Sequence, residues 1–177
     1  MSILQTLTPE TATGEVAEIY AQITQAWGYV PTAIQIYSAN PFLLRNQWEY
    51  YANMMQHPRI TFPLAACIRM LVSQGGNCTY CIDMNAGMLI GMAGWTPEQV
   101  AATRADFKNS PLTASEKMLL GLVLKATRDS NSVTALDVQA AREAGWSDAD
   151  ILDAVSHGAR MVAADILING FKVERDF

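Results

Sequence analysis

The segment that most restricts the fold is FPLAACIRMLVSQ, residues 62–74, which is apolar on almost every side when it is drawn as a helix. Such a helix is stable only when neighbouring elements cover it all round. Gly75 and Gly76 follow directly and are expected to terminate it. We therefore expect this helix at the centre of a domain, with other helices packed around it.

Helix start signals recur along the rest of the chain. Thr8-Pro9-Glu10 predicts the start of a first helix that ends at Gly28, and Asn40-Pro41 predicts a second that is interrupted at His57-Pro58. Later starts are indicated by Thr96-Pro97, and by pairs with capping-box spacing at Thr113 and Glu116, Thr134 and Asp137, and Ser147 and Asp150. The last helix is expected over about 148–169. No run alternates apolar and polar residues, so the predicted fold class is all-α, with about 7–9 helices.

The chain of 177 residues is long enough for one well-buried domain. We predict a single domain over 1–177, with a helical lead-in over about 1–60 and a C-terminal helical half over about 111–177. Half of the residues are hydrophobic and 16% are charged, which argues against disorder. This high apolar share also suggests that part of the surface is covered by another subunit, as in a homo-oligomer.

Charge and hydropathy exclude several classes of partner. The net charge of −5 disfavours a nucleic-acid surface. No stretch approaches 18 uninterrupted apolar residues, so no membrane span is expected. The N-terminus MSILQTLTPE lacks the features of a signal peptide, and three cysteines do not make a secreted disulfide framework, so we expect a cytoplasmic protein.

The motif that carries chemistry is GGNCTYCIDMNAG, residues 75–87. Asn77 is the expected cap of the next helix, and Cys78 and Cys81 lie on one face of that helix because residues three apart are neighbours. Unpaired N–H groups and the helix dipole at this end favour a thiolate at Cys78. A thiolate attacks peroxides and disulfides, and a second thiol nearby resolves the product as a disulfide.

Two other interpretations of the cysteine pair stay open at this stage. Both cysteines could be small buried packing residues at a helix start. A zinc site needs four ligands, and the remaining candidates, Cys67, His57 and His157, show no paired ligand spacing. We therefore expect no metal and no bound cofactor.

The residues around this motif resemble a known family. PLAACIRMLVSQGGNCTYCIDMNAGML is similar to the core of the carboxymuconolactone decarboxylase superfamily, and is closest to its alkyl hydroperoxidase D-like (AhpD-like), peroxidase-related branch. The most specific part is the C-x-Y-C motif after a long apolar helix. The flanking segments resemble the same branch, so that the likeness covers roughly residues 15–170.

This resemblance implies an all-helical fold, a homo-oligomer of two, three or six subunits, and thiol-dependent reduction of hydroperoxides. It implies that Cys81 attacks the peroxide and that Cys78 resolves the intermediate, whereas the dipole argument alone favours Cys78 as the more acidic thiol. Active members also have a proton relay of a glutamate and a histidine. Their positions fall on Ala66 and Asn85 here.

The loss of both relay residues has a physical consequence. Imidazole accepts a proton near neutral pH, whereas the Asn85 amide offers a polar contact only. Losing a general base typically lowers a rate by a factor of about 10²–10⁴. A carboxylate or histidine from another helix would restore the proton transfer, and His157, Glu49 and Glu116 are the candidates, each with packing or a solvated face as its simpler interpretation.

Other residues near the motif have simpler explanations. Asp83 falls nearly opposite Cys81 on the helix, and Cys67 and Tyr80 are expected to be packing residues. Packing in the core or at a subunit interface is also expected for the methionines at 54, 55, 70, 84, 88 and 92.

The leading hypothesis is an antioxidant thiol oxidoreductase, an alkyl hydroperoxide reductase or a disulfide reductase, that uses the CxxC pair and an external thiol or protein reductant. The missing relay predicts weakened turnover. The alternative is a non-enzymatic redox-sensing or binding module on the same fold. Decarboxylase or isomerase activity on a lactone acid ranks lowest, because the members with that activity generally lack the CxxC pair.

Overall fold

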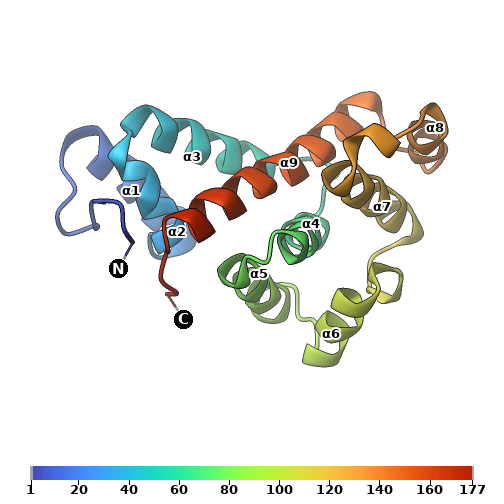
Figure 1. Cartoon of the computed structure of the whole chain (residues 1–177), viewed down its shortest axis with the longest axis horizontal. Coiled ribbons are helices and arrows are strands. Elements are labelled where there is room, and N and C mark those ends of the chain that lie inside the picture. The colour runs from blue at the N-terminus through green and yellow to red at the C-terminus, as the bar shows by residue number, and fades with distance from the viewer. Residues whose placement is uncertain (1, 177) are drawn as a thin grey trace. The chain divides into compact units, whose positions relative to one another are not determined.

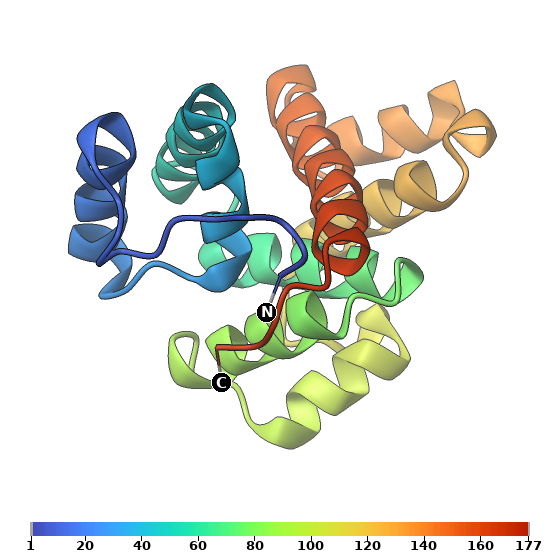
Figure 2. The same ribbon diagram turned by 60° about the vertical axis from the view of Figure 1, so that its left-hand side comes forward.

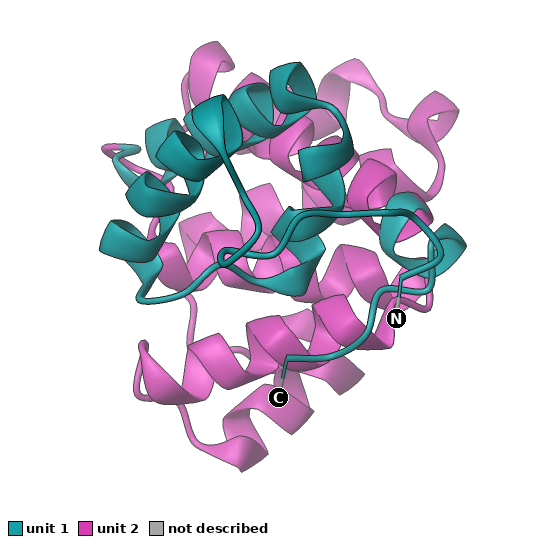
Figure 3. Cartoon of the chain, turned by 90° about the vertical axis from the view of Figure 1, so that its left-hand side faces the viewer, with its two compact units in different colours: residues 1–57, 167–177 teal, residues 58–166 magenta. Residues whose placement is uncertain are grey.

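The structure is a computed structural model that describes residues 2–176, and that range contains only helices and their connections, with no strand. The all-α prediction is therefore confirmed (Figure 1). The chain divides into two compact units, residues 1–57 with 167–177 and residues 58–166 (Figure 3). The prediction of a single domain stays a prediction.

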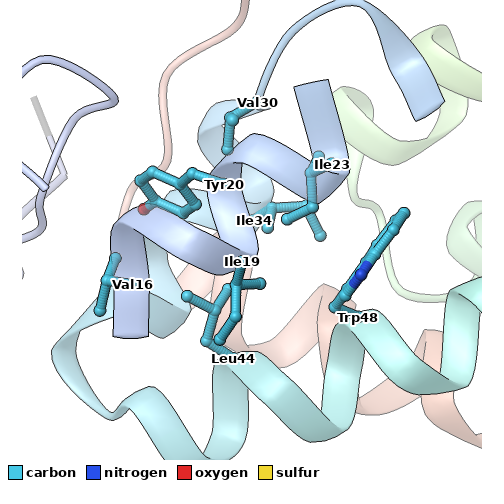
Figure 4. Close-up of a cluster of buried hydrophobic side chains, with 8 residues drawn as sticks. All are labelled: Val16, Ile19, Tyr20, Ile23, Val30, Ile34, Leu44 and Trp48. Carbon is cyan, nitrogen blue, oxygen red and sulfur yellow. The ribbon is translucent and has the colours of Figure 1, made fainter. Parts of the chain in front are cut away.

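The first unit is built on two packed helices. Its elements are α1 (Gly14–Trp27), α2 (Thr32–Gln35), the 3₁₀ helix η1 (Ile36–Ala39) and α3 (Pro41–Met55). Buried apolar side chains from these helices and from the connection between α1 and α2 form one cluster of Val16, Ile19, Tyr20, Ile23, Val30, Ile34, Leu44 and Trp48 (Figure 4). The C-terminal segment joins this unit, since the Thr32 hydroxyl donates to the carbonyl of Glu174 at 2.7 Å.

The predicted start of the first helix is wrong. Helix α1 begins at Gly14 with Thr13 as its N-cap, not at Pro9. The hydroxyl of Thr11 accepts the N–H of Thr8 at 2.9 Å, and the carbonyl of Thr8 accepts the N–H of Ala12 at 2.9 Å. These bonds close a separate turn ahead of the helix. The predicted end is confirmed, because Gly28 caps α1 with φ +84°.

The second unit surrounds the apolar helix. Its elements are α4 (Phe62–Gly75), α5 (Thr79–Gly91), α6 (Pro97–Ala105), η2 (Phe107–Asn109), α7 (Ala114–Arg128), η3 (Ser130–Ser132), α8 (Ala135–Glu143) and α9 (Asp148–Gly170) up to Ile166. Residues 64–68 and 70–73 of α4 are buried. Helix α4 packs against α5 and α7 (Figure 1, Figure 2), as expected for a helix that is apolar all round.

The three predicted capping-box pairs of this unit are confirmed. Reciprocal side-chain and backbone hydrogen bonds join Thr113 to Glu116 and Thr134 to Asp137, and Ser147 and Asp150 exchange bonds of the same kind. A further capping box, Thr96 with Gln99, opens α6. Among the helices of residues 2–176, none is long and apolar enough to cross a membrane.

Candidate active site at the start of helix α5

The turn between α4 and α5 places both cysteines. Gly76 caps α4, and the N–H of Cys78 donates to the carbonyl of Ser73 at 3.1 Å. Asn77 takes a left-handed conformation with φ +50°, so it is not the helix cap that its position predicts. The N-cap of α5 is Cys78, because its side chain accepts the N–H of Cys81 at 3.4 Å.

Cys78 and Cys81 form a disulfide across the first turn of α5, with Cα atoms 5.3 Å apart. Their exposed fractions are 0% and 2%, so the bond is shielded from bulk solvent. The N-cap position gives the sulphur of Cys78 a backbone N–H, and a donor of this kind favours the charged form of a thiol once the bond is reduced.

A carboxylate from a distant part of the sequence completes the site. Asp165 of α9 places an oxygen within 4.8 Å of both sulphur atoms, and its side chain is buried with 3% exposure. Its Oδ1 accepts the Ser73 hydroxyl at 2.7 Å, whereas Oδ2 is buried without a hydrogen-bond partner among the described residues. Helices α4, α5 and α9 therefore each contribute to one small polar cluster.

The space for this carboxylate is supplied by Gly76. A Cβ atom at position 76 would lie 2.7 Å from Oδ2 of Asp165, which is far inside van der Waals contact. The φ of Gly76 is −85°, which any residue can adopt. Glycine is therefore favoured here by the close approach of the Asp165 side chain and not by the backbone conformation.

Burial raises the pKa of the Asp165 carboxyl to about 6, while the hydrogen bond from Ser73 opposes this shift. The cause is the cost of moving a negative charge out of water. A carboxyl that titrates near 6 both accepts and donates a proton close to neutral pH. Sequence reasoning missed Asp165, although it lies eight residues after the buried His157 on the same face of α9.

The two positions that the family relay would occupy have other surroundings. Ala66 is fully buried in α4. Asn85 donates from its amide to the carbonyl of Cys81 at 2.8 Å and accepts from the Arg69 guanidinium at 2.6 Å. Arg69 also lies 3.2 Å from a ring nitrogen of His157. The Asn85 side chain thus holds Arg69 and the backbone of α5.

Each of the three candidate substitutes for the relay has its own surroundings in this structure. Burial, together with the charge of Arg69, lowers the pKa of His157 to about 3, so its ring stays neutral near pH 7. Burial acts to raise the pKa of Glu116, but hydrogen bonds from Thr61 and Thr113 lower it below its usual value. The same bonds connect the N-cap of α4 with that of α7. Glu49 is exposed on α3 of the other unit.

The remaining cysteine is a packing residue in this structure. Cys67 is fully buried in α4 and is not part of a disulfide. Burial, followed by the charge of Glu116, raises the pKa of its thiol to about 12. A thiol with such a pKa carries almost no thiolate near pH 7 and reacts poorly.

The site offers limited support for a metal. Once reduced, Cys78 and Cys81 would present two sulphurs beside the Asp165 carboxylate, a group of three potential ligands. A closed structural zinc site has four protein ligands. This group lacks a fourth, and while the disulfide is closed its sulphurs are not thiolate ligands.

No protein-family model and no curated protein matches this sequence. Solved structures do match it. A peroxidase-related protein from Silicibacter sp. TM1040 superposes with a TM-score of 0.84 at 19% identity, over 98% of this chain and 91% of that one. An AhpD-core, peroxidase-related protein from Ralstonia eutropha JMP134 superposes with a TM-score of 0.85 at 18% identity, over 99% and 92%. This chain has the AhpD-like fold.

The same fold carries a further named activity. A variant of the debrominase Bmp8, in complex with 2,3,4-tribromopyrrole, matches with a TM-score of 0.80 at 14% identity, over 99% of this chain and 94% of that one. Identities this low show the AhpD-like fold and leave the reaction to be argued from the site itself.

Proposed function

We propose that this protein is a thiol oxidoreductase that cycles Cys78 and Cys81 between dithiol and disulfide and reduces hydroperoxides. The observation that carries the proposal is the disulfide at the start of α5 with the Asp165 carboxylate within 4.8 Å of both sulphurs. The pair stores two electrons, and the carboxylate gives the site a titratable group where the family relay is missing.

The reaction balances as follows for a hydroperoxide ROOH. The Cys81 thiolate attacks the outer oxygen, the O–O bond breaks, and the alkoxide leaves as ROH after taking one proton. Cys81 is then a sulfenic acid. The Cys78 thiol attacks its sulphur, the S–S bond forms, and the hydroxyl leaves as water. One dithiol and one ROOH thus give one disulfide, ROH and water.

The assignment of Cys81 as the attacking thiol follows the resemblance, and the cap geometry agrees with the resolving role of Cys78. The Cys78 sulphur receives the N–H of Cys81, which stabilises a thiolate at that position. A thiol that is easily charged is the better leaving group when an external thiol attacks Cys81 and reopens the disulfide. The reductant, an external thiol or a reductant protein, leaves as its own disulfide.

Burial favours small substrates over folded protein disulfides. The two sulphurs are 0% and 2% exposed, and attack on a disulfide requires direct access to the sulphur atom. A small hydroperoxide needs a much smaller opening than a protein partner does. A brominated pyrrole belongs in the same substrate panel, because the Bmp8 debrominase shares the fold and a dithiol can supply the two electrons that replace bromine by hydrogen.

The proposal is tested by turnover with Cys78→Ser and Cys81→Ser. Wild-type protein with cumene hydroperoxide and excess dithiothreitol should consume peroxide faster than the reductant alone. Cys81→Ser should lose this activity, and Cys78→Ser should be slower than wild type, because only dithiothreitol can then resolve the Cys81 sulfenic acid. Cys67→Ser is the matched control and should keep the activity, because Cys67 is outside the disulfide. Turnover that neither substitution in the pair lowers would eliminate the proposal.

The alternative function is redox sensing without turnover. It is favoured by the relay positions, which hold Ala66 and Asn85, and by the buried bond. Thiol titration with mass spectrometry after one equivalent of peroxide separates the two. A sensor forms the 78–81 disulfide but does not sustain peroxide consumption with dithiothreitol. An enzyme forms the disulfide and sustains peroxide consumption.

A further inference from the structure

We infer that Asp165 is the proton-transfer residue of the Cys78–Cys81 pair and takes the place of the missing glutamate and histidine. As a carboxylate it accepts a proton when the disulfide closes, and as a carboxylic acid it returns a proton when the disulfide opens. This inference rests on the proposed thiol–disulfide chemistry and names the group that moves its protons.

The Asp165 carboxylate lies beside both sulphurs of the pair. The carboxylate oxygen lies within 4.8 Å of both sulphurs, a separation that one intervening water or a small shift bridges. Of the two oxygens, Oδ1 is held by Ser73 at 2.7 Å, while Oδ2 has no partner among residues 2–176. A buried oxygen without a partner is costly, so its retention beside a dithiol points to a use for the second oxygen.

Neighbouring residues are also fitted to the carboxylate. Gly76 leaves the space that any Cβ atom would fill at 2.7 Å from Oδ2, and Ser73 fixes the rotation of the carboxyl group. These residues come from α4 and its cap, whereas Asp165 comes from α9. A positioned acid with a restricted orientation is what proton transfer to a nearby sulphur requires.

The electrostatic surroundings make the group titrate in a useful range. The sulphurs of Cys78 and Cys81 both lie within 4.8 Å of the Asp165 carboxylate, and the Ser73 hydroxyl of α4 donates to it. Burial is the largest cause of the shift and raises the pKa of Asp165 to about 6. Above that pH the carboxylate accepts the proton of a reacting thiol, and below it the acid supplies the proton to a departing thiolate.

The proton steps balance with the redox steps. In closure, Asp165 takes the proton of the attacking Cys81 thiol and gives it to the departing alkoxide, which becomes ROH. In the resolving step, the proton of the Cys78 thiol leaves with the hydroxyl group as water. In opening, a thiolate of dithiothreitol attacks Cys81, the S–S bond breaks, and the departing Cys78 sulphur takes the proton of the Asp165 acid. The mixed disulfide then resolves within dithiothreitol and releases Cys81.

The test is the pH dependence of single-turnover closure and opening in Asp165→Asn, with Asp153→Asn as the control on the exposed side of the same helix. Closure by one equivalent of cumene hydroperoxide should rise through an inflection near pH 6 in wild type. Asp165→Asn should close about 10²-fold more slowly at pH 7 and lack the inflection. Asp153→Asn should match wild type.

Opening of the disulfide by dithiothreitol, normalised to its thiolate concentration, separates this inference from the proposed function. The role of Asp165 is supported if the rate of opening in wild-type protein shows an inflection near pH 6 and the rate in Asp165→Asn does not. This result holds even if no hydroperoxide is turned over. Turnover of hydroperoxide with closure and opening profiles in Asp165→Asn within twofold of wild type at every pH overturns the inference and leaves the proposed function standing.

A second variant covers the case in which Asp165→Asn does not fold. Ser73→Ala removes the hydrogen bond that lowers the pKa of Asp165, so the inflection in both profiles should move to higher pH. An inflection that stays in place, or moves to lower pH, in a folded Ser73→Ala protein contradicts the role of Asp165.

Discussion

Asp165 also makes the stability of the folded protein depend on pH. Its pKa is about 6 in the fold and close to 3.9 in an unfolded chain. An acid with a raised folded pKa binds its proton more tightly when folded. Ionisation of Asp165 therefore destabilises the fold, and this cost is smallest at low pH, where the group is protonated. The free energy of unfolding falls as pH rises from about 4 through 6.

We predict that the free energy of unfolding of Asp165→Asn, relative to that of wild type, is about 1 kcal/mol higher at pH 8 than at pH 5. Urea unfolding of the oxidised proteins at both pH values measures the difference. His157, whose lowered pKa removes stability as pH falls below about 6.5, is present in both proteins and cancels. Parallel pH dependences of wild type and variant would contradict the buried, ionisable Asp165.

At the residue scale, the sequence predicted Cys78 and Cys81 as site residues but did not predict Asp165. Three-residue spacing at a helix start is local information, so Cys78 and Cys81 could be placed on one face. Asp165 is far along the chain, and its meeting with α5 depends on how α9 packs, which periodicity does not report. Its one signal was a charged residue on the buried face of an apolar helix, eight residues after His157.

At the scale of elements, the position of α9 depends on a close helix crossing at Gly158. A Cβ atom there would lie 2.6 Å from Cγ1 of Val123 and 3.0 Å from Cγ2 of Thr127, both on α7, and 3.7 Å from Val72 on α4. Overpacking of this kind typically costs about 1–3 kcal/mol, against a gain of up to about 1 kcal/mol from replacing glycine by alanine in a helix.

Gly158→Ala is therefore expected to lower the free energy of unfolding, by about 1–2 kcal/mol after this offset. Gly87→Ala is the matched control, because Gly87 is exposed within α5 and nothing lies within 4 Å of its added Cβ atom. That substitution should raise the free energy of unfolding by up to about 1 kcal/mol. Chemical denaturation measures both, and equal signs would refute a close α7–α9 crossing.

Most elements could be predicted because helix ends are decided by short sequences. The reciprocal bonds of Thr113 with Glu116 and of Thr134 with Asp137 form within one turn, as their spacing indicates. The exceptions arose where two local solutions compete. Thr8 has the features of a cap, but its bonds with Thr11 and Ala12 close a turn instead. Asn77 likewise has a favourable cap residue type, but it adopts a left-handed conformation and Cys78 is the N-cap of α5.

At the scale of the whole molecule, the fold persists while the sequence changes. The peroxidase-related structures superpose with TM-scores of 0.84 and 0.85 at only 19% and 18% identity. Such agreement is expected when the fold is specified by the placement of apolar and capping residues, since many side chains satisfy the same pattern. The pattern of a buried α4 was readable from the sequence for that reason, whereas the choice of reaction depends on a few residues.

The predicted homo-oligomer has a candidate surface on α9. The side of this helix away from its buried residues exposes Leu152, Ala159, Val162 and Ile166, with Leu152 and Ile166 at 69% and 66% exposure. These residues recur at helical spacing, so they form one apolar stripe. Contiguous exposed apolar surface is typical of protein interfaces, and a second copy of the chain is the occupant that the resemblance implies.

We predict that wild-type protein has a mass in light scattering that is a multiple of the 19.4 kDa chain, and that the double substitution Leu152→Glu and Ile166→Glu reduces it. Charges on the stripe would have to be buried without partners if the interface formed, which strongly disfavours association. Leu136→Glu is the control, because Leu136 is more exposed but lies on α8. A wild-type mass of one chain, or equal loss of mass in Leu136→Glu, would show that the α9 stripe is not the interface.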